Sequence, residues 1–125
     1  MRAGCTGRSK AGAAGSSAVA PRDLELAAEF ARRLRKAAGG VAFEVTLFGS
    51  RARGDNERDS DLDLFVAVDV DHLPPAFLES ARAVAADLTL EAGILVSAFL
   101  ADREYMRTHQ GWSLLETIAE EGVPV

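Results

Sequence analysis

A strand-like run that ends in Gly49-Ser50 and is followed by Asp61-Leu62-Asp63 constrains this chain more than any other feature. The run from Val41 to Phe48 alternates in a way that predicts a strand, and the run from Asp61 to Val68 predicts another. The ten residues between Ser50 and Asp61 are dense in charge and turn formers. Because the chain turns back between two strands, we expect the Gly-Ser turn and the two aspartates to meet in one site.

The Gly-Ser turn is suited to phosphate. Glycine lets the backbone turn sharply and approach a ligand closely, and a short helix starting at Ser50 would offer free N–H groups to an anion. The Ser50 hydroxyl adds a donor, and Arg51 and Arg53 supply planar cations that match phosphate oxygens. Taken alone, Gly-Ser is also a common structural turn.

The aspartate pair is suited to a divalent cation. In a strand, residues two apart share a face, so Asp61 and Asp63 project side by side. Two adjacent carboxylates repel each other and are costly to desolvate. Mg²⁺ removes this repulsion, and it prefers one or two carboxylates together with phosphate oxygens. The pair alone is a common strand end, but next to a phosphate turn it predicts a site for phosphoryl-group transfer.

The remaining pattern predicts one small α/β (α+β) domain at 21–125, preceded by a flexible Gly/Ala/Ser-rich tail at 1–20. We expect a mixed sheet of three to four strands with flanking helices. The other predicted elements are helices at 22–38, from the paired prolines 74–75 to about 90, after Asp102, and at 113–121, and a strand at 93–100.

Composition narrows the function classes. The net charge of -5 and the pI near 5.0 argue against a nucleic-acid-coating role. The single cysteine, Cys5, allows no internal disulfide, which fits a reducing cytoplasm. No run reaches the roughly 20 apolar residues that a transmembrane helix needs, so no membrane association is expected.

The segment GSRARGDNERDSDLDLFV resembles the signature of the minimal nucleotidyltransferase domains of the polymerase β-like nucleotidyltransferase superfamily. Their pattern is a hydrophobic residue, Gly and Gly or Ser, a spacer of about ten residues, and then two acids that alternate with hydrophobic residues. The closing segment, 102–125, also resembles members that end in a helix and a Gly-containing strand. The resemblance covers roughly residues 24–125.

The resemblance implies a polymerase β-like core and transfer of a nucleoside monophosphate from a nucleoside triphosphate, with ATP favoured, to a hydroxyl. It implies that Asp61 and Asp63 bind Mg²⁺ and act in catalysis, that Gly49 and Ser50 hold the β- and γ-phosphates, and that Arg51 or Arg53 steadies the triphosphate. Many such domains are antitoxins of toxin–antitoxin systems, paired with a helical HEPN-type ribonuclease toxin, and some form homodimers.

One position departs from the family pattern. Fully active relatives carry a third carboxylate on the third core strand, where this chain has Ser97. Glu91 shares the strand parity of Ser97 if that strand extends back so far. Loss of one carboxylate should weaken metal binding and base catalysis.

Three functions therefore stay open at the level of sequence. The first is an active nucleotidyltransferase that modifies a protein or a small acceptor. The second is a catalytically weak or inactive binding module that covers a helical partner, as an antitoxin does. The third is a nucleotide sensor that binds without turnover.

Overall fold

A four-stranded mixed sheet forms the centre of the fold. The structure is a computed structural model, and it describes residues 18–125. The strands are β1 (Phe43–Phe48), β2 (Leu62–Val68), β3 (Val96–Ala101) and β4 (Val123–Pro124), and their order in the sheet is β3-β2-β1-β4. β1 pairs antiparallel with β2 and with β4, whereas β2 and β3 are parallel. The expected α/β (α+β) fold with three to four strands is confirmed.

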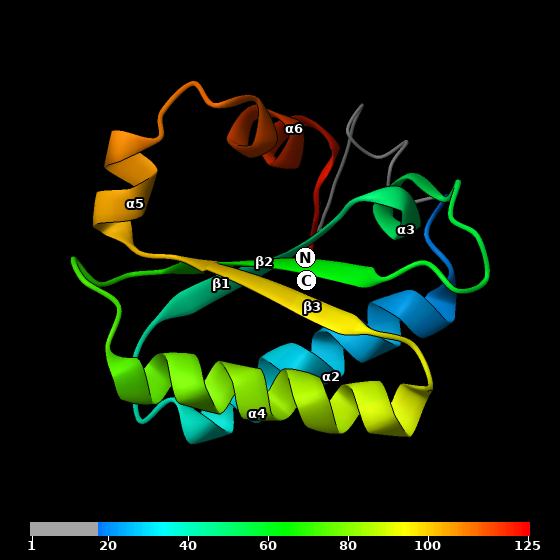
Figure 1. The fold of residues 1–125 in the computed structure, drawn as a ribbon, viewed down its shortest axis with the longest axis horizontal. Coiled ribbons are helices and arrows are strands. Elements are labelled where there is room, and N and C mark those ends of the chain that lie inside the picture. Colours follow the sequence, from blue (N-terminus) through cyan, green and yellow to red (C-terminus); the bar gives the residue numbers. More distant parts are fainter. Residues whose placement is uncertain (1–17) are drawn as a thin grey trace, which may run out of the picture.

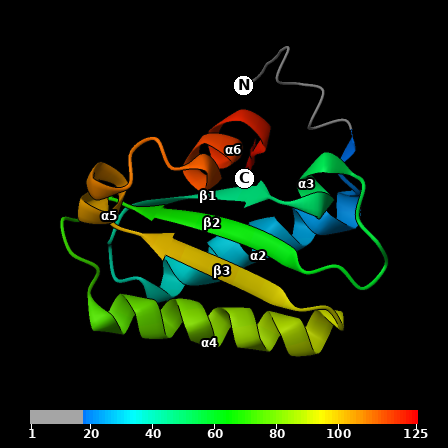
Figure 2. The same ribbon diagram turned by 45° about the horizontal axis from the view of Figure 1, so that its top comes forward.

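Helices cover both faces of this sheet (Figure 1). Helices α2 (Pro21–Ala37) and α4 (Pro75–Ala92) lie on one face, and α5 (Arg103–Thr108) and α6 (Ser113–Glu121) lie on the other. A single short turn, α3 (Ser50–Arg53), sits at the end of β1. The turned view in Figure 2 shows β3 at the outer margin of the sheet, beside α4.

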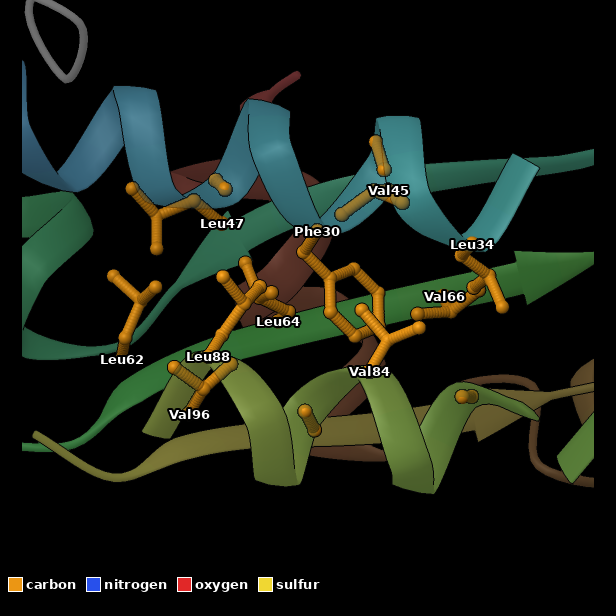
Figure 3. Close-up of a cluster of buried hydrophobic side chains, with 14 of the residues drawn as sticks. Phe30, Leu34, Val45, Leu47, Leu62, Leu64, Val66, Val84, Leu88 and Val96 are labelled. Atoms are coloured by element: carbon orange, nitrogen blue, oxygen red, sulfur yellow. The ribbon is translucent and has the colours of Figure 1, made fainter. Parts of the chain in front are cut away.

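Two apolar clusters follow from the alternation of side chains along β2. Leu62, Leu64 and Val66 point to the α2/α4 face and are fully buried. There they pack in the main core (Figure 3), together with Phe30, Leu34, Val84 and Leu88. Phe65 points the other way and packs with Ile118 and Ala101 beneath α5 and α6. Asp63 has the parity of Phe65, so it faces away from the main core.

The expected helices are present, with small shifts at their ends. The expected strand at 93–100 begins only at Val96, because α4 continues to Ala92 and Gly93 caps it with a φ of 78°. The side chain of Thr89 secures this turn by accepting a bond of 2.9 Å from the Val96 N–H. The helix at 113–121 is confirmed at both ends.

Most of the expected tail, residues 1–17, lies outside the described residues. Val19 is described, and it is buried against the main core at 7% exposure. Among the helices at positions 18–125, none combines the length and the apolar character that crossing a bilayer demands.

Candidate functional site

Gly49 and Asp63 meet where β1 ends. Asp63 is the cross-strand partner of Phe48, the last residue of β1, and Gly49 follows with φ 83° and ψ -161°. A Cβ atom added to Gly49 would lie 2.5 Å from Oδ2 of Asp63. Only glycine satisfies both this backbone conformation and this contact. The Gly-Ser turn and the second aspartate are therefore brought into one place.

Helix α3 starts at Ser50, as the phosphate interpretation requires. The carbonyl of Gly49 accepts bonds of 3.1 Å from the N–H groups of Ala52 and Arg53. Gly54 ends the turn with a φ of 80° and donates to the carbonyl of Ser50. The N–H groups that open a helical turn have no partner within it, so this turn presents backbone donors beside Gly49.

Asp61 and Asp63 form the acidic side of the site. Asp63 is half-buried in β2, and Asp61 is exposed just before the strand begins. Burial raises the pKa of the Asp63 carboxyl above its usual value, and the negative charge of Asp61 raises it further. The charge of Asp61 thus disfavours the charged form of Asp63, and a divalent cation bound nearby would relieve this repulsion.

The position beside Asp63 on the third strand is Ser97. The parallel pairing of β2 with β3 sets Asp63 opposite Ser97, and the Ser97 side chain is exposed. Glu91 does not replace the missing acid: it lies in α4, not on a strand. Its carboxylate accepts bonds of 2.9 and 2.8 Å from the Arg33 guanidinium. Within residues 18–125, no group of three or more acidic, histidine or cysteine side chains could hold a metal.

The two arginines of the turn have different surroundings. The structure does not bring Arg51 to the phosphate side of the turn, because its side chain is 7% exposed and binds the buried Asp23 at 3.0 Å. Asp23 lies in the first turn of helix α2, and its distance of 28 residues from Arg51 leaves no local sequence signal for this pairing. Arg53 is exposed and pairs loosely with Asp55 at 3.1 Å and with Glu121 at 3.5 Å.

The donor set fits Mg²⁺ bound together with a polyphosphate. Mg²⁺ keeps several water or phosphate ligands and takes only one or two protein carboxylates. Asp61 and Asp63 would supply two, and the contact with Gly49 leaves the Asp63 carboxylate next to the turn that would hold the phosphates.

Comparisons with known proteins identify the family of this chain. The model of a family described as "Nucleotidyltransferase domain" matches residues 27–121. A protein of Methanocaldococcus jannaschii named "Putative protein adenylyltransferase" is 30% identical over 94 residues, which are 75% of this chain and 88% of the relative. No solved structure gives a significant match. The chain belongs to the nucleotidyltransferase family, as a minimal nucleotidyltransferase domain of the polymerase β-like superfamily.

Proposed function

We propose that this domain transfers a nucleoside monophosphate, most simply AMP from ATP, to a hydroxyl group of another protein. The observation that carries the proposal is the contact between Gly49 and the Asp63 carboxylate. It joins a backbone suited to phosphates with a pair of acids suited to Mg²⁺. The named activity of the Methanocaldococcus jannaschii relative supports adenylyl as the group and protein as the acceptor.

Each residue has a defined task in this proposal. Asp61 and Asp63 hold Mg²⁺, and Gly49 and Ser50 hold the β- and γ-phosphates through backbone N–H groups and the Ser50 hydroxyl. The bound cation would neutralise charge on the phosphates and the leaving pyrophosphate. Exposed Arg53 can leave its loose partners and turn to the triphosphate. We leave Arg51 out of the nucleotide site because its guanidinium is buried against Asp23.

The reaction follows from this arrangement. The hydroxyl oxygen of the acceptor forms a bond to the α-phosphorus and the hydroxyl proton passes to water. The bond from the α-phosphorus to the oxygen bridging to the β-phosphorus breaks, and pyrophosphate leaves. The domain contributes by holding the triphosphate in line with the acceptor, which is the main protein contribution to such transfers. By family resemblance, a HEPN-type helical toxin is the first acceptor to test.

The test is transfer of label from α-labelled ATP to protein in a lysate of the source cells, with Mg²⁺ present. Asp63→Asn should lower labelling by about 100-fold or more, because charge stabilisation in the transition state is lost. Asp59→Asn is the matched control, since Asp59 is an exposed acid of the same loop. Equal labelling by wild type and Asp63→Asn would refute the proposal.

A second function, a binding module with weak or no catalysis, is favoured by Ser97 at the position beside Asp63. Such a module would neutralise a helical toxin by covering it. Co-expression with a HEPN-type toxin whose growth arrest the wild type relieves separates the two functions. The module predicts that Asp61→Asn/Asp63→Asn still restores growth, whereas the enzyme predicts that this variant fails.

A further inference from the structure

Arg51 makes more buried polar contacts than its position in a surface turn would suggest. Its Nη1 donates to both carboxylate oxygens of Asp23, at 3.0 and 3.2 Å. Its Nε donates to the carbonyl of Ser60 at 2.9 Å, and its Nη2 donates to the carbonyl of Arg58 at 3.0 Å. One guanidinium thus binds two segments that are distant in sequence.

These contacts span the two halves of the candidate site. Arg51 follows Gly49-Ser50 directly, and Ser60 directly precedes Asp61. The segment that Arg51 holds is itself a closed turn, because the Glu57 N–H donates to the Ser60 hydroxyl at 2.9 Å and the Ser60 N–H donates to the Glu57 carbonyl at 3.2 Å. A rigid turn fixed at its carbonyls leaves little freedom for the next residue, Asp61.

Asp23 completes this arrangement from helix α2. It is 1% exposed and lies in the first turn of the helix, so its carboxylate is held in place by helix α2, which packs on the main core. A buried guanidinium needs such a partner, because an unpaired buried charge is strongly unfavourable. The planar fork of arginine can bind a carboxylate and two carbonyls at once, and lysine, with one nitrogen, cannot keep this geometry.

We propose that Arg51 is a positioning residue, clamped by Asp23, that fixes Asp61 relative to the Gly49-Ser50 turn and so sets the affinity of the site for its divalent cation. The proposal rests on the proposed function only in taking Asp61 and Asp63 as the cation ligands. It assigns Arg51 no contact with the nucleotide.

The test measures Mn²⁺ binding by electron paramagnetic resonance, with and without a non-hydrolysable ATP analogue, and unfolding in urea. Arg51→Lys should weaken Mn²⁺ binding by about tenfold or more, as loss of residues that orient metal ligands does elsewhere. Asp23→Asn should also weaken it, by less, since the amide oxygen still accepts one bond. Arg51→Met removes the guanidinium altogether and should weaken Mn²⁺ binding at least as much as Arg51→Lys does. The two conservative variants, Arg51→Lys and Asp23→Asn, carry the test if Arg51→Met does not fold.

Phe77→Leu is the control for a loss of stability without a change in the site. Phe77 is buried and packs on Phe43, at the end of the sheet opposite Asp63. This variant should unfold at lower urea and bind Mn²⁺ as the wild type does. An effect of Phe77→Leu as large as that of Arg51→Lys would overturn the positioning role.

Two further outcomes separate the proposals. Folded Arg51→Lys that binds Mn²⁺ as wild type does, or that loses affinity only for the ATP analogue, overturns the positioning role and leaves the proposed function intact. If wild type and Asp63→Asn bind Mn²⁺ equally, the cation site itself is wrong, and the role of Arg51 falls with it.

Discussion

The α-carbon of Gly49 rests on the carboxylate of Asp63, and there is no room for a methyl group between them. This contact joins the end of β1 to the beginning of strand β2. Because of this contact, a substitution in the Gly49-Ser50 turn should shift the Asp63 carboxylate, and a substitution of Asp63 should shift the turn.

Gly49→Ala tests this contact. The new Cβ would lie 2.5 Å from Oδ2 of Asp63, so the carboxylate must move. We expect nucleotidyl transfer to fall by about 100-fold, the effect of a displacement near 1 Å in an active site. Activity and urea unfolding measured together check the prediction.

Gly93→Ala is the matched control for Gly49→Ala. Gly93 also has a positive φ, 78°, but an added Cβ would meet nothing within 4 Å. It should lose about 1–2 kcal/mol of stability, the cost of a left-handed conformation for alanine, and keep its activity. Equal loss of activity in both variants would show that backbone strain, not the contact with Asp63, is responsible.

Ser97→Asp tests whether the site lacks a ligand. Ser97 is exposed and paired with Asp63 across the sheet, so an aspartate there would face the same cation. We expect Mn²⁺ binding without nucleotide to tighten by about tenfold, since each added carboxylate raises the affinity for hard cations. Calorimetry measures the change, and Ser97→Asn, of the same shape without charge, should leave the affinity as in wild type.

Breaking the buried ion pair of Asp23 and Arg51 should cost more stability than breaking the surface ion pair of Glu91 and Arg33. Asp23→Ala leaves the buried Arg51 without its carboxylate and should cost about 3–5 kcal/mol in urea unfolding at pH 7. Glu91→Ala breaks the bond to Arg33 at the surface, where solvent screens the charges, and should cost far less. Similar costs for the two variants would contradict the buried clamp.

The Asp102 carboxylate should make a pH-dependent contribution to the stability of the fold. The Tyr105 N–H, assisted by the Leu73 N–H and by His72, holds the pKa of Asp102 below its usual value. Each N–H bond is 2.8 Å long, and each goes to a different carboxylate oxygen. Because the folded pKa is lowered, this contribution is present above about pH 4 and is lost as the pH falls through the folded pKa.

Asp102→Asn checks that expectation. The amide has one acceptor oxygen, so one of the two N–H bonds is lost, at a cost of about 1 kcal/mol at pH 7. Urea unfolding at pH 7 and pH 3 should show a smaller difference between wild type and variant at the lower pH. A difference that does not change with pH would mean that the charge of Asp102 contributes nothing.

Local pattern was enough to predict most of the fold. The alternation Leu62, Leu64, Val66 predicts one buried face of β2 and places Asp63 on the other. The helix at 113–121 is visible in its apolar spacing. By contrast, the start of β3 depends on how Gly93 and Thr89 close the end of α4, a contact between elements that spacing does not reveal.

The limits of sequence reasoning are clearest at Arg51. Its place after Gly49-Ser50 suggests a phosphate ligand, yet the guanidinium turns inward because Asp23, 28 residues earlier, is buried beside it. Such a pairing depends on how α2 packs against the turn, and no local signal encodes it. The partnership of Asp63 with Ser97 likewise depends on the register of two parallel strands.

Strand β3 forms one of the two margins of the sheet, since the order is β3-β2-β1-β4. Ser97 lies on that margin, next to Asp63. Neighbouring strands stand about 4.8 Å apart, so a chain that extended the sheet beyond β3 would run only two strand spacings from the Asp63 backbone. A chain that paired with β3 would then lie close to the carboxylates of the candidate site. Binding of such a chain and binding of a cation at these carboxylates could therefore affect each other.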